Sequence, residues 1–264
     1  MADFLEEVTA KTRQRIDMQK AQMSLDQLQK RLGHVSPHRP FEKALRQSGK
    51  VALIAELKQA SPSAGIIRKE QDIPGRIKAY TKGGAAALSI LTEEHYFHGS
   101  PQLLEEARGL SHLPLLRKDF IVDPYQIAES KSLGADAVLL ITGLLPGVLL
   151  RDFISRAQDI ELETLVEVHE ERDLDQALEA GARVIGINNR NLRTLRVDLA
   201  TAEKLLAKAP KKGVTLVVES GIKSSAELPH LKMLGAHAVL IGETFMRADD
   251  PEKIVKEFAQ ACQK

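Results

Sequence analysis

The 264-residue sequence contains one cysteine, no tryptophan and only 4% aromatic residues. The lone Cys262 cannot form a disulfide within the chain, so a reducing, cytoplasmic location is the simplest expectation. Neither charge sign is in excess, because 37 basic side chains are balanced by 36 acidic ones and the net charge is +1. This balance gives no reason to expect nucleic acid or an anionic membrane as a partner.

Long apolar runs are missing as well. The longest apolar tract, residues 137–150, is broken by Thr142, Gly143, Pro146 and Gly147, and a membrane span needs roughly 18 apolar residues. The first seven residues lack the basic-then-apolar order of a signal peptide. With 43% hydrophobic residues, we expect a soluble protein with one large hydrophobic core.

From residue 51 onward the sequence alternates short apolar runs with amphipathic segments. Such runs predict strands buried on both faces of a parallel sheet. A glycine-led phrase recurs at residues 83, 134, 181 and 235, each time where a helix should end and a strand should follow. Eight strands are predicted, over residues 51–58, 86–92, 113–120, 137–142, 164–169, 184–189, 215–220 and 238–242.

Eight βα units in about the ~250 residues usual for this architecture predict the α/β class and a (β/α)8 TIM barrel over residues 51–264. The alternative, a doubly wound open sheet, normally carries a G-x-G-x-x-G turn after its first strand, and residues 60–65 (ASPSAG) do not match. Residues 1–50 predict an N-terminal helical extension packed on the barrel, with helical spacing from Phe4 to Ile16 and further helices over 24–32 and 41–47. Its basic residues, such as Lys11 and Arg15, are interpreted as a solvated helix face.

Charged and amide side chains stand at the carboxyl ends of five predicted strands, where a buried strand has no structural use for them. Burying one such ion without a partner costs several kcal/mol, to order of magnitude. Loops after the strands build the active site of such barrels, and opposite charges there hold one another ionised. Any one residue is about as well explained by a salt bridge or a cap, but the whole set favours catalysis. The candidates are Glu56, Lys58, Lys118, Glu167, Asn188 and Glu219.

The ends of the last two predicted strands indicate a phosphate site. Ser220-Gly221 and Gly242-Glu243 open loops that lead toward helices on the last two strands, where barrels often bind phosphate through backbone N–H groups. Ser61 follows the first strand, which is adjacent once the barrel closes. The expected apolar wall consists of Phe97, Phe120, Leu139, Ile141 and Leu192.

Some polar residues are expected to have no chemical function. Arg117 and Asp119 should face the helices, whereas Arg190 shares the inward face with Asn188. The cluster His95-Tyr96-Phe97-His98 lacks the spacing of a zinc motif, so we expect no metal and interpret this segment as a loop over the substrate.

Six segments resemble the indole-3-glycerol-phosphate synthase family, in order along the barrel. They are AELKQASPS (55–63), LTEEHYFHGS (91–100), LRKDFIVD (116–123), LVEVH (165–169), IGINNRNL (185–192) and VESG (218–221). The helical extension is also typical of that family. Six motifs in register are specific to it, whereas the phosphoribosylanthranilate isomerases are similar only in the phosphate region.

The resemblance implies closure of 1-(2-carboxyphenylamino)-1-deoxyribulose 5-phosphate to indole-3-glycerol phosphate, with loss of CO2 and water, in tryptophan biosynthesis. It implies no metal or organic cofactor. Lys118 matches the family's general acid for ring closure. Glu167 and Lys58 match the acid and base of dehydration, with their division left open, and Glu56 would hold Lys58 charged.

The resemblance further implies that Glu219 and Asn188 stabilise the cationic intermediate and grip substrate hydroxyls. Arg190 matches a contact with the anthranilate carboxylate or with the carboxylate network. Phosphate would lie against Ser61, Ser220, Gly221, Gly242 and the backbone N–H of Glu243. Many relatives carry serine at position 243, so the glutamate side chain there must turn away from the phosphate.

Two other functions compete with this interpretation. A sugar-phosphate isomerase of the phosphoribosylanthranilate type works with a Cys/Asp pair, and Cys262 lies outside every strand end. A non-catalytic phosphate-binding barrel would keep the phosphate loops but not Lys118 and Glu167. We therefore expect a phosphorylated small-molecule substrate, no nucleic-acid or membrane partner, and a monomer or weak homo-oligomer.

Overall fold

Eight parallel strands close into a barrel, in the order β1-β10-β9-β8-β7-β6-β5-β4 around the ring. The computed structural model describes residues 4–32, 35–69, 72–210 and 212–263. All eight predicted strands are confirmed, each with ends within about two residues of the prediction. Their bounds are β1 (Ala52–Leu57), β4 (Ala87–Leu91), β5 (Leu115–Lys118), β6 (Ala137–Ile141), β7 (Glu163–Val168), β8 (Val184–Asn188), β9 (Thr215–Glu219) and β10 (Ala238–Ile241).

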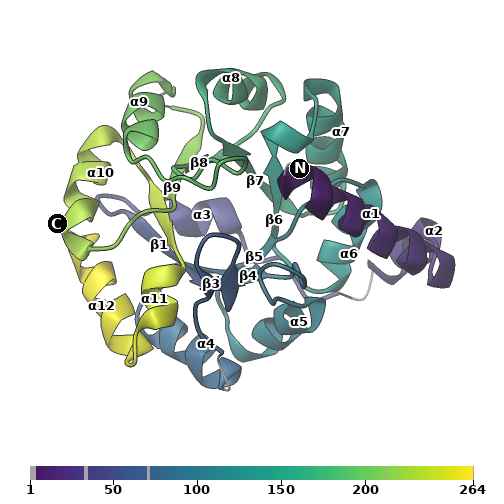
Figure 1. Ribbon diagram of the computed structural model, residues 1–264, viewed down its shortest axis with the longest axis horizontal. Helices are drawn as coiled ribbons and strands as arrows, with labels where there is room; N and C mark the ends of the chain where they lie inside the picture. Colours follow the sequence, from purple (N-terminus) through teal and green to yellow (C-terminus); the bar gives the residue numbers. More distant parts are fainter. Residues whose placement is uncertain (1–3, 33–34, 70–71, 211, 264) are drawn as a thin grey trace.

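Helices follow the strands and form a ring outside the barrel (Figure 1). The last of them is α12 (Pro251–Ala261). The others are α4 (Ile73–Lys82), α5 (Pro101–Leu110), α6 (Pro124–Ser132), α7 (Gly147–Asp159), α8 (Glu171–Glu179), α9 (Ala200–Lys208), α10 (Leu228–Leu234) and α11 (Glu243–Arg247), with 3-10 turns at Thr142–Leu144 and Ser225–Glu227.

Strand periodicity separates two hydrophobic layers. Alternate residues such as Ile54 and Leu165 fill the barrel interior, whereas Leu53 and Val166 pack against the surrounding helices. Because successive side chains point to opposite faces, the inward series on β1 runs from Ile54 to Glu56 at the carboxyl end. The apolar interior therefore gives way to charged side chains at one end of the barrel.

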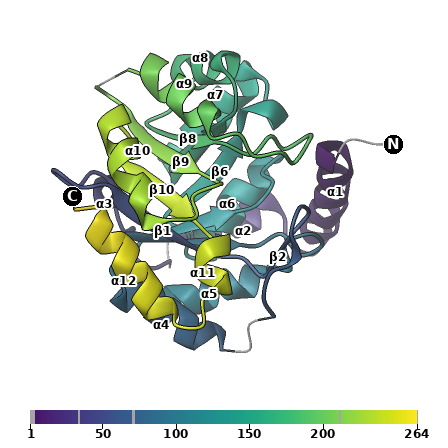
Figure 2. The same ribbon diagram turned by 60° about the vertical axis from the view of Figure 1, so that its left-hand side comes forward.

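The N-terminal segment contributes helices to both ends of the barrel. These are α1 (Phe4–Gln22), α2 (Leu25–Arg31), which Ser24 and Gln27 cap, and α3 (Phe41–Leu45). The fully buried Phe41 and Leu45 of α3 join the interior cluster, and the N–H groups of Phe41 and Glu42 donate to Glu163, the first residue of β7. Helix α3 thus closes the end at which the strands begin, while α1 lies at the other end (Figure 2).

The prediction that the basic residues of α1 form a solvated face is wrong for the half-buried Arg15, whereas Lys20 is exposed as predicted. Arg15 Nη2 donates to the buried Asp119 at 3.0 Å, and Lys20 forms an ion pair with Asp123 at 2.7 Å. Lys11 Nζ donates to the hydroxyl of Tyr96 at 3.0 Å. These side chains attach α1 to the loops at the barrel mouth.

Two short hairpins at the mouth were not predicted. Strands β2 (Ala60–Ser61) and β3 (Gly65–Ile66) pair after β1, and an antiparallel bridge joins Arg190 to Val197 after β8. Both hairpins border the same opening, because Arg190 Nη1 donates to Ser63 Oγ at 2.7 Å.

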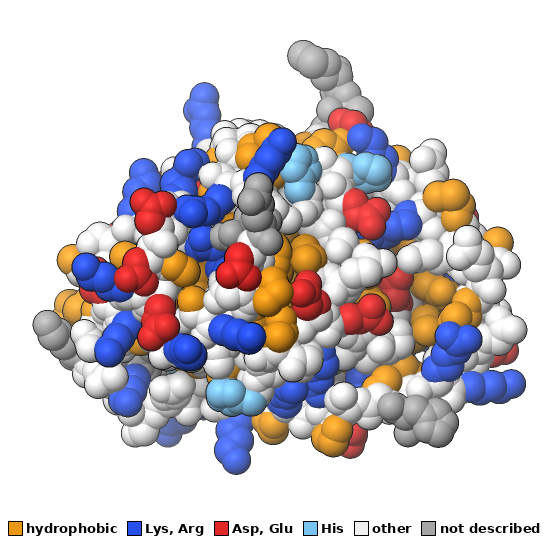
Figure 3. Space-filling view, turned by 90° about the horizontal axis from the view of Figure 1, so that it is seen from below, with side chains coloured by type: hydrophobic (Ala, Val, Ile, Leu, Met, Phe, Trp, Pro, Cys, Tyr) orange, Lys and Arg blue, Asp and Glu red, His pale blue; other side chains and the backbone are white. Residues whose placement is uncertain are grey.

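The outer surface carries charges of both signs. On the face seen from below, near α4 and α12, acidic and basic side chains are interspersed (Figure 3). Among the described residues, no helix combines the length and the apolar character needed to cross a bilayer.

Candidate active site

A cavity of about 1010 Å³ opens at the carboxyl ends of the strands. Every residue predicted for the site lines it: Glu56, Lys58, Ser61, Phe97, Lys118, Phe120, Leu139, Ile141, Glu167, Asn188, Arg190, Leu192, Glu219, Ser220, Gly221, Gly242 and Glu243. These residues are spread over nearly 190 positions of the chain, from Glu56 to Glu243, and closure of the barrel brings them together.

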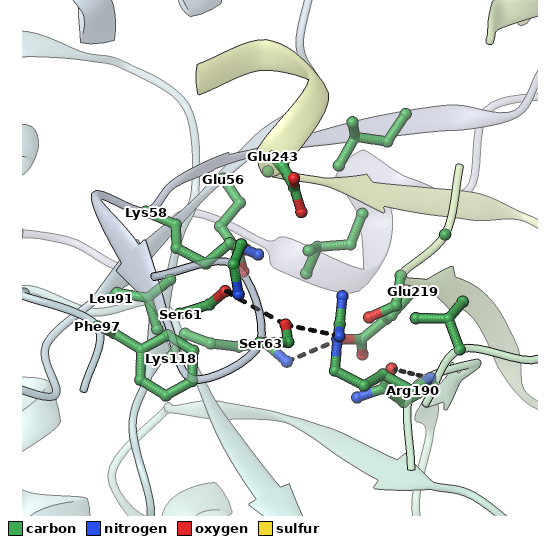
Figure 4. A pocket seen from close by; sticks show the side chains of 18 of the residues that line it. Glu56, Lys58, Ser61, Ser63, Leu91, Phe97, Lys118, Arg190, Glu219 and Glu243 are labelled. Atoms are coloured by element: carbon green, nitrogen blue, oxygen red, sulfur yellow. Dashed lines mark hydrogen bonds and ion pairs between the residues drawn. The ribbon is translucent and has the colours of Figure 1, made fainter. Parts of the chain in front are cut away.

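The floor of the cavity is a charged layer contributed by four alternate strands of the barrel. It contains Glu56 from β1, Lys118 from β5, Glu167 from β7 and Glu219 from β9. Lys118 Nζ donates to Glu167 Oε2 at 2.9 Å and to Glu219 Oε2 at 2.7 Å. This arrangement follows from the period of two, which points each of these side chains inward. Figure 4 shows Glu56, Lys118 and Glu219 at the pocket.

A second ion pair lies beside this layer. Lys58 Nζ is 2.9 Å from Glu56 Oε1, and Ser89 Oγ donates to Glu56 Oε2 at 3.2 Å. Both lysines keep some access to the cavity, with 19% of the Lys58 side chain and 12% of the Lys118 side chain exposed, whereas the carboxylates are 4% exposed or less. The ammonium groups are therefore the charges that a bound molecule would meet first.

Electrostatic interactions within this layer keep Lys118 and Glu56 charged. Burial alone would lower the pKa of Lys118, but the carboxylates of Glu167 and Glu219 outweigh burial and raise it above its ordinary value. Burial would likewise raise the pKa of Glu56, but Lys58 and Lys118 outweigh that effect and lower it. Lys118 is thus an ammonium and Glu56 a carboxylate at neutral pH.

Glu219 differs from its neighbours. Burial, which Lys118 only partly offsets and Glu167 reinforces, raises the pKa of Glu219 to about 7. Its Oε1 atom has no hydrogen-bond partner among the described residues. Near neutral pH, Glu219 can therefore gain or lose a proton at little cost.

We expect Glu219→Gln to change how stability depends on pH. The raised pKa means that the folded protein holds a proton that the unfolded chain has lost between about pH 4.5 and 7. The stability from this proton is fully present below about pH 4.5 and is lost as the pH rises through 7. The free energy of unfolding of the parent should thus fall relative to that of Glu219→Gln, by at most about 1.4 kcal/mol per pH unit.

Urea denaturation at several pH values measures this difference. Glu105→Gln, which alters an exposed carboxylate on α5, is the matched control. Parallel stability curves for Glu219→Gln and the parent over this pH range would show that Glu219 has no raised pKa.

Amide and guanidinium groups border the charged layer on the β8 side. Asn188 Nδ2 donates to Glu167 Oε1 at 3.0 Å, and Asn188 Oδ1 accepts from the backbone N–H of Arg190 at 2.9 Å. His169 Nδ1 is 2.7 Å from the carbonyl oxygen of Asn188, so this histidine holds the backbone of β8. No carboxylate of the described residues forms an ion pair with Arg190, whose guanidinium reaches across the opening to Ser63 (Figure 4).

Arg117 and Asp119 lie behind Lys118. Arg117 is fully buried and faces α6, as predicted, where it forms an ion pair with Glu129 at 2.8 Å. Asp119 accepts from Arg117, from Thr92 and from Arg15 of α1, although it also borders the cavity. This network fixes the backbone on both sides of the inward-facing lysine.

One end of the cavity has backbone suited to an anion. Ser220 and Gly221 both have positive φ, 66° and 84°, which turns the chain sharply after β9. Gly242 follows β10, and Glu243 begins α11, where its Oε1 accepts from Arg247 Nε at 3.0 Å. The carboxylate of Glu243 is thus paired with a cation on the next helical turn.

The other end of the cavity is aromatic and apolar. Phe97 and Phe120 have ring centroids 6.2 Å apart. Sequence analysis missed Phe4 of α1, which lines the cavity and packs edge-on against Phe120 at 5.9 Å. The helical spacing of Phe4 indicated burial, but nothing in the sequence indicated which end of the barrel α1 would cover.

Glu93 is a second residue that sequence analysis missed. Its buried carboxylate accepts from the backbone N–H groups of His95, Tyr96 and Phe97. This carboxylate therefore holds the backbone of the loop after β4. Among the described residues, no group of three or more histidine, cysteine, aspartate or glutamate side chains is arranged to hold a metal ion.

Comparison with known proteins identifies close relatives. The family model for indole-3-glycerol phosphate synthase matches residues 5–258. The chain is 44% identical over 260 residues to indole-3-glycerol phosphate synthase of Carboxydothermus hydrogenoformans, covering 96% of this chain and 98% of the relative. It is also 44% identical over 257 residues to the protein of that name from Acetivibrio thermocellus, covering 97% of this chain and 98% of the relative.

More distant solved structures share the fold. The 3-hexulose-6-phosphate synthase of Salmonella typhimurium superposes with a TM-score of 0.65 at 16% identity, covering 80% of this chain and 98% of that one. Thiamine phosphate pyrophosphorylase of Pyrococcus furiosus gives a TM-score of 0.63 at 15% identity, covering 84% and 98%. These similarities concern the barrel architecture alone.

Proposed function

The chain belongs to the indole-3-glycerol phosphate synthase family of carboxy-lyases, and from that premise we propose that Lys118 is the general acid of ring closure. One observation carries this assignment above all. Its ammonium lies within hydrogen-bond distance of Glu167 and Glu219 at the mouth of the closed barrel. The roles assigned below rest on similar contacts.

The reaction converts 1-(2-carboxyphenylamino)-1-deoxyribulose 5-phosphate into indole-3-glycerol phosphate, CO2 and water, in tryptophan biosynthesis. An aromatic carbon attacks the ketone, and an alkoxide develops on the former ketone oxygen. Lys118 donates a proton to this oxygen, and Glu167 and Glu219 hold the lysine in the charged form that such donation needs. Departure of CO2 then restores the aromatic ring.

Dehydration needs an acid for the departing hydroxyl and a base for the ring N–H proton. Lys58 and Glu167 supply these two groups as a pair. Glu56 orients Lys58 through the ion pair at 2.9 Å. Lys58 and Glu167 both line the cavity.

Polar groups around the layer grip the rest of the substrate. Glu219 and Asn188 stabilise the cationic intermediate and bind substrate hydroxyls. Arg190 binds the anthranilate carboxylate, since its guanidinium has no carboxylate partner of its own among the described residues. Phe97, Phe120, Leu139, Ile141 and Leu192 sandwich the anthranilate ring.

The phosphate group occupies the opposite end of the cavity. It lies against Ser61, against the positive-φ turn of Ser220 and Gly221, and against the backbone at Gly242 and Glu243. The pairing of Glu243 with Arg247 reduces repulsion between the glutamate and the phosphate.

Residues 1–50 and 51–264 act as one catalytic unit in this proposal, because α1 and α3 share the interior cluster of the barrel. The single cysteine, Cys262, is buried, and it supports a cytoplasmic location. The protein is a monomer or weak homo-oligomer in this proposal. Light scattering at micromolar concentration measures the oligomeric state, and a stable higher oligomer would contradict this part of the proposal.

Incubation with the carboxyphenylamino-deoxyribulose phosphate tests the function directly. We expect indole fluorescence and released CO2 to appear together, in equal amounts, without added metal or cofactor. EDTA should leave the rate unchanged. Substrate loss without indole, or product formation that depends on an added metal, would contradict the proposal.

A further inference from the structure

Gly186 occupies an unusual place in the barrel. It lies in the middle of β8, in register with Glu167 on one side and Val217 on the other. Glycine weakens a strand, and within a strand it often marks a close approach of another group. Gly186 is not among the glycines with positive φ, so its backbone conformation is open to any residue. The reason for glycine at this position must be space.

The space beside Gly186 is occupied by the carboxylate of Glu219. A Cβ atom on residue 186 would overlap Glu219 Oε1 and would lie 3.2 Å from Glu219 Cδ and 3.3 Å from Leu165 Cδ1. Glu219 stands on the neighbouring strand β9, in register with Asn188, one inward position nearer the mouth than Gly186. Its carboxylate therefore leans down into the place that a side chain at 186 would fill.

Gly242 has the same relationship with the other ion pair. A Cβ atom there would overlap Glu56 Oε1 and lie 3.2 Å from Lys58 Nζ. Small residues on alternate strands thus make room for two inward carboxylates. Gly186 gives the clearer case, because Gly242 also borders the phosphate end of the cavity.

We propose that Gly186 is a positioning residue, whose missing side chain lets the Glu219 carboxylate lie where its Oε2 meets Lys118 at 2.7 Å. Any larger residue at 186 displaces Glu219 and breaks that contact. The inference rests on the proposed catalytic roles of Glu219 and Lys118, but the steric contact on which it depends can be tested without them.

A stability cycle tests the contact. Gly186→Ala is introduced into three backgrounds: the parent, Glu219→Gln and Glu219→Ala. Glutamine keeps the length of the side chain at position 219, whereas alanine removes the atoms that a Cβ at position 186 would meet. We expect Gly186→Ala to lower the urea midpoint in the parent and in Glu219→Gln, and to have no such effect in Glu219→Ala. Gly109→Ala adds a methyl where nothing lies within 4 Å and is the matched control. An equal loss in all three backgrounds would overturn the inference.

Kinetics of Gly186→Ala separate positioning from a general loss of structure. We expect kcat to fall by about tenfold or more and KM to stay within about threefold, because Gly186 touches neither the aromatic nor the phosphate end of the cavity. Glu219→Asp, with a shorter side chain, should recover part of the lost kcat in the Gly186→Ala background. Gly186→Ala could lower stability only where the longer side chain at position 219 is present and yet leave kcat unchanged. That outcome would overturn the role proposed for Glu219, and with it the positioning function of Gly186.

Discussion

Lys118→Ala is expected to lower kcat by roughly 10³-fold while the barrel remains folded. The substitution removes the proposed proton donor for the developing alkoxide. It also removes the charge that balances Glu167 and Glu219. A continuous assay of indole fluorescence measures the loss, and far-UV circular dichroism checks the fold.

A matched control separates catalysis from burial. Lys131 of α6 is also a buried lysine, but it donates to the carbonyl oxygen of Glu161 outside the cavity. Lys131→Ala should reduce stability and leave kcat within about threefold of the parent. Near-parent turnover in Lys118→Ala would show that another group protonates the alkoxide.

The raised pKa of Lys118 is compatible with its role as an acid. An ammonium surrounded by carboxylates is a weak acid toward water, so it stays protonated throughout the neutral range. The alkoxide that forms on the substrate is a far stronger base than water. Proton transfer from Lys118 therefore becomes favourable only as the alkoxide forms during ring closure. The lysine thus stabilises the transition state more than the bound substrate.

The ion pairs at the floor of the cavity can also respond to the charge of the substrate. Three carboxylates, on Glu56, Glu167 and Glu219, pair there with two ammonium groups, on Lys58 and Lys118. With a pKa of about 7, Glu219 can take up a proton when the substrate brings its own carboxylate and phosphate. Such uptake would reduce repulsion in a cavity that must hold several anions.

The sequence predicted the architecture because each of its signals was local. Apolar runs of five or six residues, such as 184–188, end in a polar residue, and a glycine marks four of the helix-to-strand connections. Closure of the barrel then places all the carboxyl ends together. For that reason Lys118 and Glu167, 49 positions apart, could be expected at one site, and they lie 2.9 Å apart.

Contacts of the N-terminal helices could not be predicted in the same way. Arg15 reaches Asp119 across 104 positions, and Phe4 lines the cavity from a helix outside the βα repeat. No periodic pattern specifies where such a helix docks, since docking depends on the shape of the finished barrel. The function of Gly186 was hidden for a related reason, because a missing side chain has meaning only when its neighbours are placed.

Glu167→Gln is expected to lower kcat by about 10²-fold or more while preserving the shape of the site. Both oxygens of Glu167 accept hydrogen bonds, one from Lys118 at 2.9 Å and one from Asn188 at 3.0 Å. The side chain of glutamine has only one acceptor oxygen, so its NH2 group must face one of these two donors, Lys118 or Asn188. Asn188 cannot rotate to relieve this conflict without losing the bond from the backbone of Arg190 to its Oδ1 atom.

The same substitution removes the carboxylate needed for proton transfer during dehydration, whether Glu167 acts as the acid or as the base. Glu129→Gln provides the matched control, because Glu129 is a buried carboxylate paired with Arg117 on the helix side of β5. That variant should lose stability but keep its turnover. Normal turnover in Glu167→Gln would remove Glu167 from the mechanism and leave Lys58 to be paired with another base. A large loss confined to Glu167→Gln would instead support a role of this carboxylate in the reaction, because the control variant also disrupts a buried carboxylate contact.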